Sequence, residues 1–113
     1  GLCIIHEAAY GRESREVDIA RAFRDSFLTK AQLRAYYQAY EGVAMRMRHD
    51  PRYRAHIRHT LTDHLIRYGA AQLHIPYAPQ RPEDRAISEA FLQHLSVMGE
   101  HLGPIMRSNG EVV

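Results

Sequence analysis

The sequence has little of what disulfide-rich, zinc-binding or membrane-spanning proteins need. Its single cysteine, Cys3, cannot form an internal disulfide and lacks the paired spacing of a zinc or redox site. No apolar run approaches the ~18–20 residues that cross a bilayer. There is no GxSxG or HExxH pattern and no glycine-rich phosphate loop. The sequence therefore predicts a soluble protein that works without a cofactor, a membrane or a known catalytic motif.

Cys3 itself is expected to be a small buried residue of a protein in a reducing compartment, such as the cytoplasm. A nucleophilic cysteine needs a neighbouring base, and only His6 is close in sequence. Because unpaired cysteines are mostly inert, the structural role is favoured.

Composition and pattern together predict one all-α domain over residues 1–113. The chain is 45% hydrophobic and 25% charged, which is ordinary globular usage and enough for one core. The expected architecture is four-helix bundle-like. A short N-terminal arm at residues 1–12 precedes the helices, a stiff Pro-rich connector at 76–82 precedes the last one, and the tail at 108–113 is expected to fray.

Capping and proline signals set the predicted helix boundaries. Ser14 is the expected N-cap of the first helix, and Thr29 with Gln32 matches a capping box before the second. Asp50-Pro51 ends the second helix and starts the third. Apolar residues at spacings of three and four then predict helices at 14–27, 30–49 and 51–73, and from 82 to a kink or end at Gly103-Pro104.

The stretch from residue 50 to 75 is predicted to be a central helix with neighbours on both flanks. One apolar stripe runs along its length, and a second strip of Ile66, Ala70 and Leu73 lies on the opposite side. If only one flank is covered within the chain, that strip stays exposed and is expected to bind a partner, for example a second copy in a homodimer.

Charge is unevenly distributed although the net charge is only +2. One acid, Asp50, stands among a group of arginines that we predict to be a partner-binding corner: Arg46, Arg48, Arg52, Arg54 and Arg58. Arginine keeps its charge and binds carboxylate or phosphate with a fork of donors. The small net charge and the wide arc of these residues on a helix disfavour nucleic acid as the partner, though it remains an alternative.

Eight histidines in 113 residues are unusual, and two fall within apolar stripes. If their helices pack together, His64 and His94 face each other across the core, as in helical bundles that bind metal or haem. A pocket for a small aromatic ligand is then predicted from Tyr36, Tyr40, His64, Tyr68, His94 and His101. The favoured interpretation is simpler: each imidazole lies at the core edge, hydrogen-bonded to a tyrosine or a carbonyl.

A weaker metal candidate is the group His56, His59 and Asp63, which share one helix face at spacings of three and four. A fourth ligand is missing, and the face points away from the main stripe, so a solvated polar face is favoured.

The leading hypothesis is therefore a non-enzymatic interaction or regulatory domain that binds a protein partner. The alternatives are a ligand-, metal- or haem-binding bundle, possibly an enzyme, and a nucleic-acid-binding module.

Overall fold

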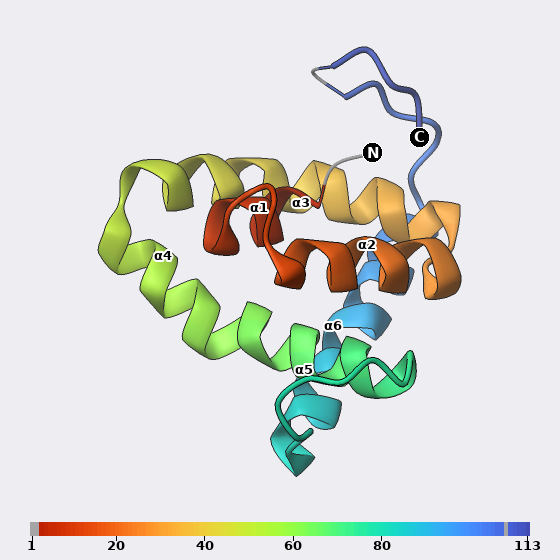
Figure 1. Ribbon diagram of the computed structural model, residues 1–113. Coiled ribbons are helices and arrows are strands. Elements are labelled where there is room, and N and C mark those ends of the chain that lie inside the picture. Colours follow the sequence, from red (N-terminus) through yellow and green to blue (C-terminus); the bar gives the residue numbers. More distant parts are fainter. Residues whose placement is uncertain (1–2, 108) are drawn as a thin grey trace.

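Capping residues and prolines divide the chain into helices, and the computed structural model shows how they pack (Figure 1). It describes residues 3–107 and 109–113. The all-α class is confirmed. The helices are α1 (Ile4–Tyr10), α2 (Arg15–Phe27), α3 (Lys30–His49), α4 (Pro51–Ile57), a π turn η1 (Arg58–Thr62), α5 (Asp63–Gln72) and α6 (Pro82–Gly99).

Three predicted caps are present where the sequence placed them. The Ser14 hydroxyl accepts the N–H of Val17, and Thr29 and Gln32 form the reciprocal capping box. The Asp50 carboxylate accepts the N–H of Tyr53 at 3.1 Å. These side chains use N–H groups that a helix start otherwise leaves unpaired, so α2, α3 and α4 begin within a residue of the predicted positions.

The predicted N-terminal arm contains a helix. Residues Ile4–Tyr10 form helix α1, in which Ile5 is fully buried and Ile4 is 5% exposed. The helix packs mainly against α3. Its few residues could not reveal a period in the sequence. Cys3, at the start of α1, is buried as predicted.

The central helix is continuous through α4, η1 and α5, because the residues at both junctions, Arg58 and Asp63, keep right-handed helical backbone angles. Its C-terminal part, α5, packs against both α2 and α6. The predicted apolar strip is covered there: Ile66 and Ala70 are each 1% exposed and pack with residues of α2. Leu73, the third residue of the strip, is partly buried. Ile66 and Ala70 are thus part of the core, and most of the expected homodimer surface on this flank is not exposed.

The C-terminal third of the chain agrees with the prediction in its connector but differs in the end of α6 and in the tail. The connector after α5 is non-helical, as expected. Helix α6 ends at Gly99, before Gly103-Pro104. In place of a fraying tail, Ile105 and Val113 exchange two backbone hydrogen bonds of 3.0 and 2.9 Å. The buried Arg107 guanidinium lies 3.9 Å over the Tyr37 ring, and Ser108 is outside the described residues.

Two apolar clusters hold the helices together. The larger one joins α1 and α3 to Leu95 of α6, and the smaller one joins Cys3, α2 and α5. None of the described helices combines the length and the apolar character needed to cross a bilayer.

We predict that Gly99→Ala destabilises the fold, because α6 crosses α3 closely at this residue. A Cβ added at Gly99 would lie 2.2 Å from the backbone oxygen of Ala31, so one helix must move. Such overpacking costs about 1–3 kcal/mol. Urea denaturation followed by circular dichroism measures the change.

Gly42→Ala is the matched control, since nothing lies within 4 Å of a Cβ there. In this exposed helical position alanine should raise the free energy of unfolding by up to about 1 kcal/mol. Equal behaviour of the two variants would contradict the close crossing.

Candidate functional site

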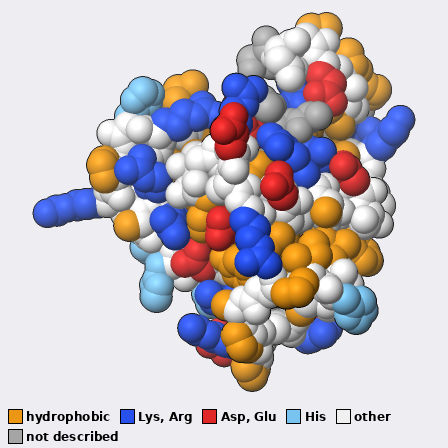
Figure 2. Space-filling view, in the orientation of Figure 1, with side chains coloured by type: hydrophobic (Ala, Val, Ile, Leu, Met, Phe, Trp, Pro, Cys, Tyr) orange, Lys and Arg blue, Asp and Glu red, His pale blue; other side chains and the backbone are white. Residues whose placement is uncertain are grey.

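The predicted arginine corner is assembled where α3 meets α4. Arg46 and Arg48 lie in the last turn of α3, Arg52 and Arg54 in α4, and Arg58 in η1. We call these five residues the basic corner. Positive charge at the C-terminal end of α3 complements the helix dipole. Lys/Arg and His side chains gather on this side of the molecule, at the left in Figure 2.

Three members of the basic corner are held by the protein itself. The Arg46 guanidinium lies 4.0 Å over the Tyr53 ring and 3.7 Å from the Asp50 carboxylate. Arg54 donates to the Met47 carbonyl at 3.1 Å. Arg58 lies over the Tyr10 ring and 3.9 Å from Asp63. These contacts fix the positions of three cations while leaving most of their donors available.

Arg48 and Arg52 are different, because both are exposed and neither makes an ion pair or hydrogen bond with any residue that the structure describes. Two shallow depressions flank Arg54. One is also lined by Glu7, Arg12 and Arg48, and the other by Arg58, His59 and Asp63. The basic corner therefore combines two arginines without a partner among the described residues and three held in place, around two shallow surface depressions.

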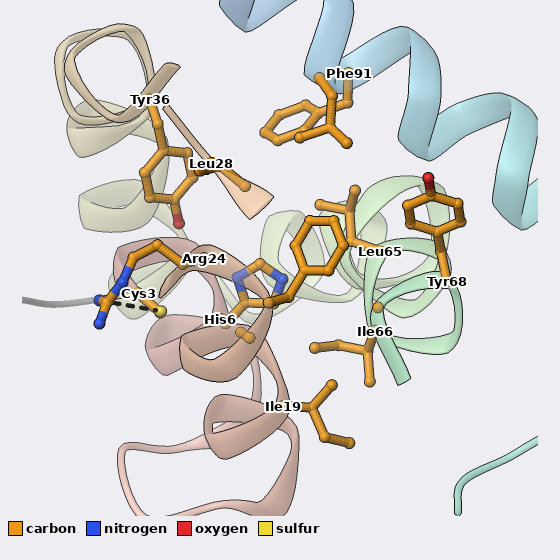
Figure 3. A pocket seen from close by; sticks show the side chains of 14 residues that line it. Cys3, His6, Ile19, Arg24, Leu28, Tyr36, Leu65, Ile66, Tyr68 and Phe91 are labelled. Carbon is orange, nitrogen blue, oxygen red and sulfur yellow. Dashed lines mark hydrogen bonds between the residues drawn. The ribbon is translucent and has the colours of Figure 1, made fainter. Parts of the chain in front are cut away.

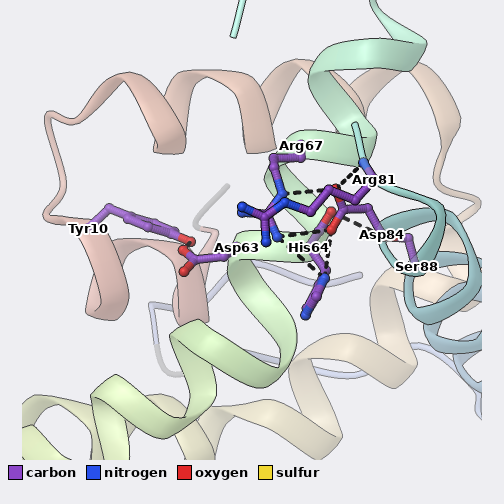
Figure 4. A network of polar contacts seen from close by, with 7 residues as sticks. All are labelled: Tyr10, Asp63, His64, Arg67, Arg81, Asp84 and Ser88. Atoms are coloured by element: carbon purple, nitrogen blue, oxygen red, sulfur yellow. Dashed lines mark hydrogen bonds and ion pairs between the residues drawn. The ribbon is translucent and has the colours of Figure 1, made fainter. Parts of the chain in front are cut away.

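A second polar group, buried and fully paired, centres on Asp84 (Figure 4). Its carboxylate is 0% exposed and accepts two hydrogen bonds from Arg67, at 2.8 and 2.9 Å. It also accepts the backbone N–H of Arg81 at 2.8 Å and lies 2.6 Å from His64 Nδ1. Burial would raise the pKa of Asp84, but these hydrogen bonds outweigh it and lower the pKa to about 2.

The predicted histidine pocket is not assembled. His64 is engaged by Asp84, whereas His94 is exposed, ten residues further along α6 and roughly 15 Å along its axis. His101 lies beyond the end of α6 and is exposed. The helical period placed His94 on the apolar stripe, but the α6 face that packs on the core is the one carrying Asp84, Ser88 and Leu95.

The three predicted tyrosines do not form a pocket with His64 and His94. Tyr36 and Tyr40 stack with ring centroids 5.8 Å apart, and the Tyr40 ring meets Phe91 edge to face. Tyr68 meets Phe23 of α2 at 5.8 Å. Their main role is therefore packing of aromatic rings, with Tyr36 in the larger cluster and Tyr68 beside α2.

The weak metal candidate is not formed either. Asp63 accepts a hydrogen bond from the Tyr10 hydroxyl and lies beside Arg58, while His56 and His59 are exposed. Burial and the Asp63 carboxylate raise the pKa of Tyr10. Within residues 3–107 and 109–113, no three His, Cys, Asp or Glu side chains converge as metal ligands would.

Two residues gain importance that the sequence did not assign them. Asp84 was not singled out from the sequence, because its partner Arg67 lies 17 residues away. His6 was considered only as a base for Cys3, yet it is 8% exposed, and burial lowers its pKa to about 4. A histidine beside Glu7 in the otherwise apolar segment 2–9 was the available signal.

Comparison with known proteins adds no functional information. No protein-family model, curated protein or solved structure matches this chain. Function is therefore inferred from the residues themselves.

We predict that Asp84→Asn strongly destabilises the protein. Loss of the carboxylate leaves the partly buried Arg67 guanidinium without its counter-charge; the cost is about 3–5 kcal/mol for a fully buried pair and should be about 2–3 kcal/mol here, because the guanidinium keeps some contact with water. Glu83→Gln is the control, since the neighbouring acid is exposed and should change the free energy of unfolding by less than about 0.5 kcal/mol. Similar, small effects in both variants would show that the buried ion pair is dispensable.

Stability should also fall in acid before the carboxyl groups titrate. The pKa of His6 is about 4 in the folded protein and near 6.5 when unfolded. The unfolded chain therefore binds the proton more readily, and folding loses about 2–3 kcal/mol as the pH falls from 6.5 towards 4. Urea titrations across this range measure the slope.

His6→Phe should flatten that slope, because phenylalanine has no proton to bind. The second loss, from Asp84, begins only as the pH falls from 3.8 to about 2. If the free energy of unfolding of His6→Phe changed with pH between 6.5 and 4 as in the wild type, a group other than His6 would cause the acid sensitivity.

Proposed function

We propose that this chain is a non-enzymatic interaction domain that binds an acidic surface of a protein partner through the basic corner. The observation that carries the proposal is the pair of exposed arginines, Arg48 and Arg52, which have no acidic partner among the described residues. Guanidinium groups of this kind bind carboxylates in a bidentate geometry.

The surrounding arginines support a protein surface as the partner. Arg46 and Arg58 are held over aromatic rings and Arg54 by a carbonyl, so little side-chain entropy is lost when they bind. The depressions beside them are shallow. Shallow depressions of this kind fit a flat protein surface better than a small ligand, which binds best in a deep pocket.

Two alternatives receive less support. A homodimer through Ile66 and Ala70 has no exposed strip to use, since α2 covers both residues. Nucleic acid is disfavoured because the net charge of the chain is only +2, so the attraction of the whole chain for a phosphate backbone is weak.

Charge reversal tests the proposal. A labelled twelve-residue glutamate-rich peptide serves as the acidic probe, and its affinity is measured by fluorescence anisotropy at low salt. The double variant Arg48→Glu/Arg52→Glu should bind it at least about tenfold more weakly, because two attractions become repulsions. Backbone NMR shifts in the wild type should concentrate at the α3–α4 junction.

The matched control is Lys30→Glu/Arg81→Glu, which changes the net charge equally at two exposed positions away from the corner. It should weaken binding by less than about threefold, the residual effect of long-range charge. Equal weakening in both double variants would mean non-specific attraction. Tighter binding of a DNA duplex than of the peptide would favour the nucleic-acid alternative.

A further inference from the structure

An apolar cavity lies where the two hydrophobic clusters meet, away from the basic corner. Its walls come from α1, α2, α3, α5 and α6 and include Ile19, Phe23, Leu28, Ile66 and Phe91. The cavity has a volume of about 50 Å³ and is partly open to solvent. Hydrophobic side chains gather on the surface between α2 and α5, to the right of centre in Figure 2.

His6 projects from α1 into this cavity, as Figure 3 shows. Only 8% of the residue is exposed. Its ring packs 6.4 Å from that of Tyr10, and it makes no hydrogen bond or ion pair with any other residue in the described part of the chain. Its ring nitrogens are therefore available to hydrogen-bond a ligand that enters the cavity.

The chemistry of the cavity favours an uncharged ligand. Burial lowers the pKa of His6, so the imidazole is neutral and offers one donor and one acceptor. Arg24 also lines the wall, but its Nε already donates to the Asp25 carboxylate at 2.9 Å. The Tyr36 hydroxyl accepts the N–H of Ile5 at 3.2 Å. A charged ligand would lose its hydration here without a counter-charge of its own.

The shape favours a flat ligand that reaches inwards with one polar group. Rings of Phe23, Tyr36, Tyr68 and Phe91 stand around the cavity and provide edge and face contacts for another ring. The volume of about 50 Å³ is less than the roughly 150 Å³ that encloses benzene in an engineered cavity. The ring of a ligand would therefore have to lie in the open mouth, with a hydroxyl group extending towards His6.

We propose that this cavity is a binding site for a small neutral phenol, whose hydroxyl group hydrogen-bonds the His6 imidazole while its ring packs among the aromatic side chains. The site is separate from the basic corner and does not depend on the function proposed for it. It also differs from the pocket predicted around His64 and His94, with which it shares Tyr36 and Tyr68.

Phenol and toluene are the probes, because they differ by a hydroxyl in place of a methyl group. Affinities are measured by NMR titration of the intact chain. We expect both probes to bind the wild type, and the ratio of phenol to toluene affinity to fall about tenfold in His6→Phe, the value of one hydrogen bond. In the wild type, phenol should also shift the imidazole nitrogen resonances of His6, whereas toluene should not.

Two control variants sharpen the test. Ala20→Leu adds bulk at a cavity wall and should weaken both probes at least about tenfold, whereas His94→Phe changes an exposed histidine and should leave the ratio unchanged. The proposal is overturned if neither probe binds the wild type, if Ala20→Leu binds both normally, or if the ratio is the same with and without His6. If His6→Phe does not fold, the His6 imidazole resonances of the wild type still test the proposal, because phenol should shift them and toluene should not.

Discussion

The bidentate pair between Arg67 and the fully buried Asp84 is the contact on which the arrangement of the C-terminal half depends. It joins α5 to the start of α6 across the non-helical connector. The same carboxylate accepts the backbone N–H of Arg81 and so caps α6. One side chain thus both starts a helix and fixes its position against another. Because the carboxylate is buried, its partners cannot be replaced by water, and the geometry is correspondingly specific.

Local signals in the sequence were sufficient for the starts of α2, α3 and α4. Ser14, Thr29 with Gln32, and Asp50-Pro51 each act on residues within one turn of themselves, so their effect can be read without the fold. The predictions that failed concerned which side of a helix packs against the core. His94 shares a three- and four-residue spacing with apolar neighbours, but which arc of α6 meets the core is set by Asp84, whose partner is distant in sequence. Ile66 and Ala70 likewise needed the position of α2 to be interpreted.

The candidate sites follow the same division. The basic corner could be located from the sequence because its arginines lie within the short segment 46–58, on both sides of the turn at Asp50. The cavity around His6 was not, since its walls come from five helices far apart in sequence. It exists because the two apolar clusters pack against different helices and leave a gap at their meeting point. The basic corner and the cavity are thus two separate features of the same helical fold.

The π turn between Arg58 and Thr62 has a consequence for changes in chain length. A π turn contains one residue more than the α-helical turn it replaces, so losing that residue would restore an ordinary α turn and leave everything after it on the same helix faces. His64 and Arg67 would then still face Asp84, and Thr60, in the middle of the turn, is exposed. At this surface position the helix can therefore lose one residue without changing which side chains meet Asp84.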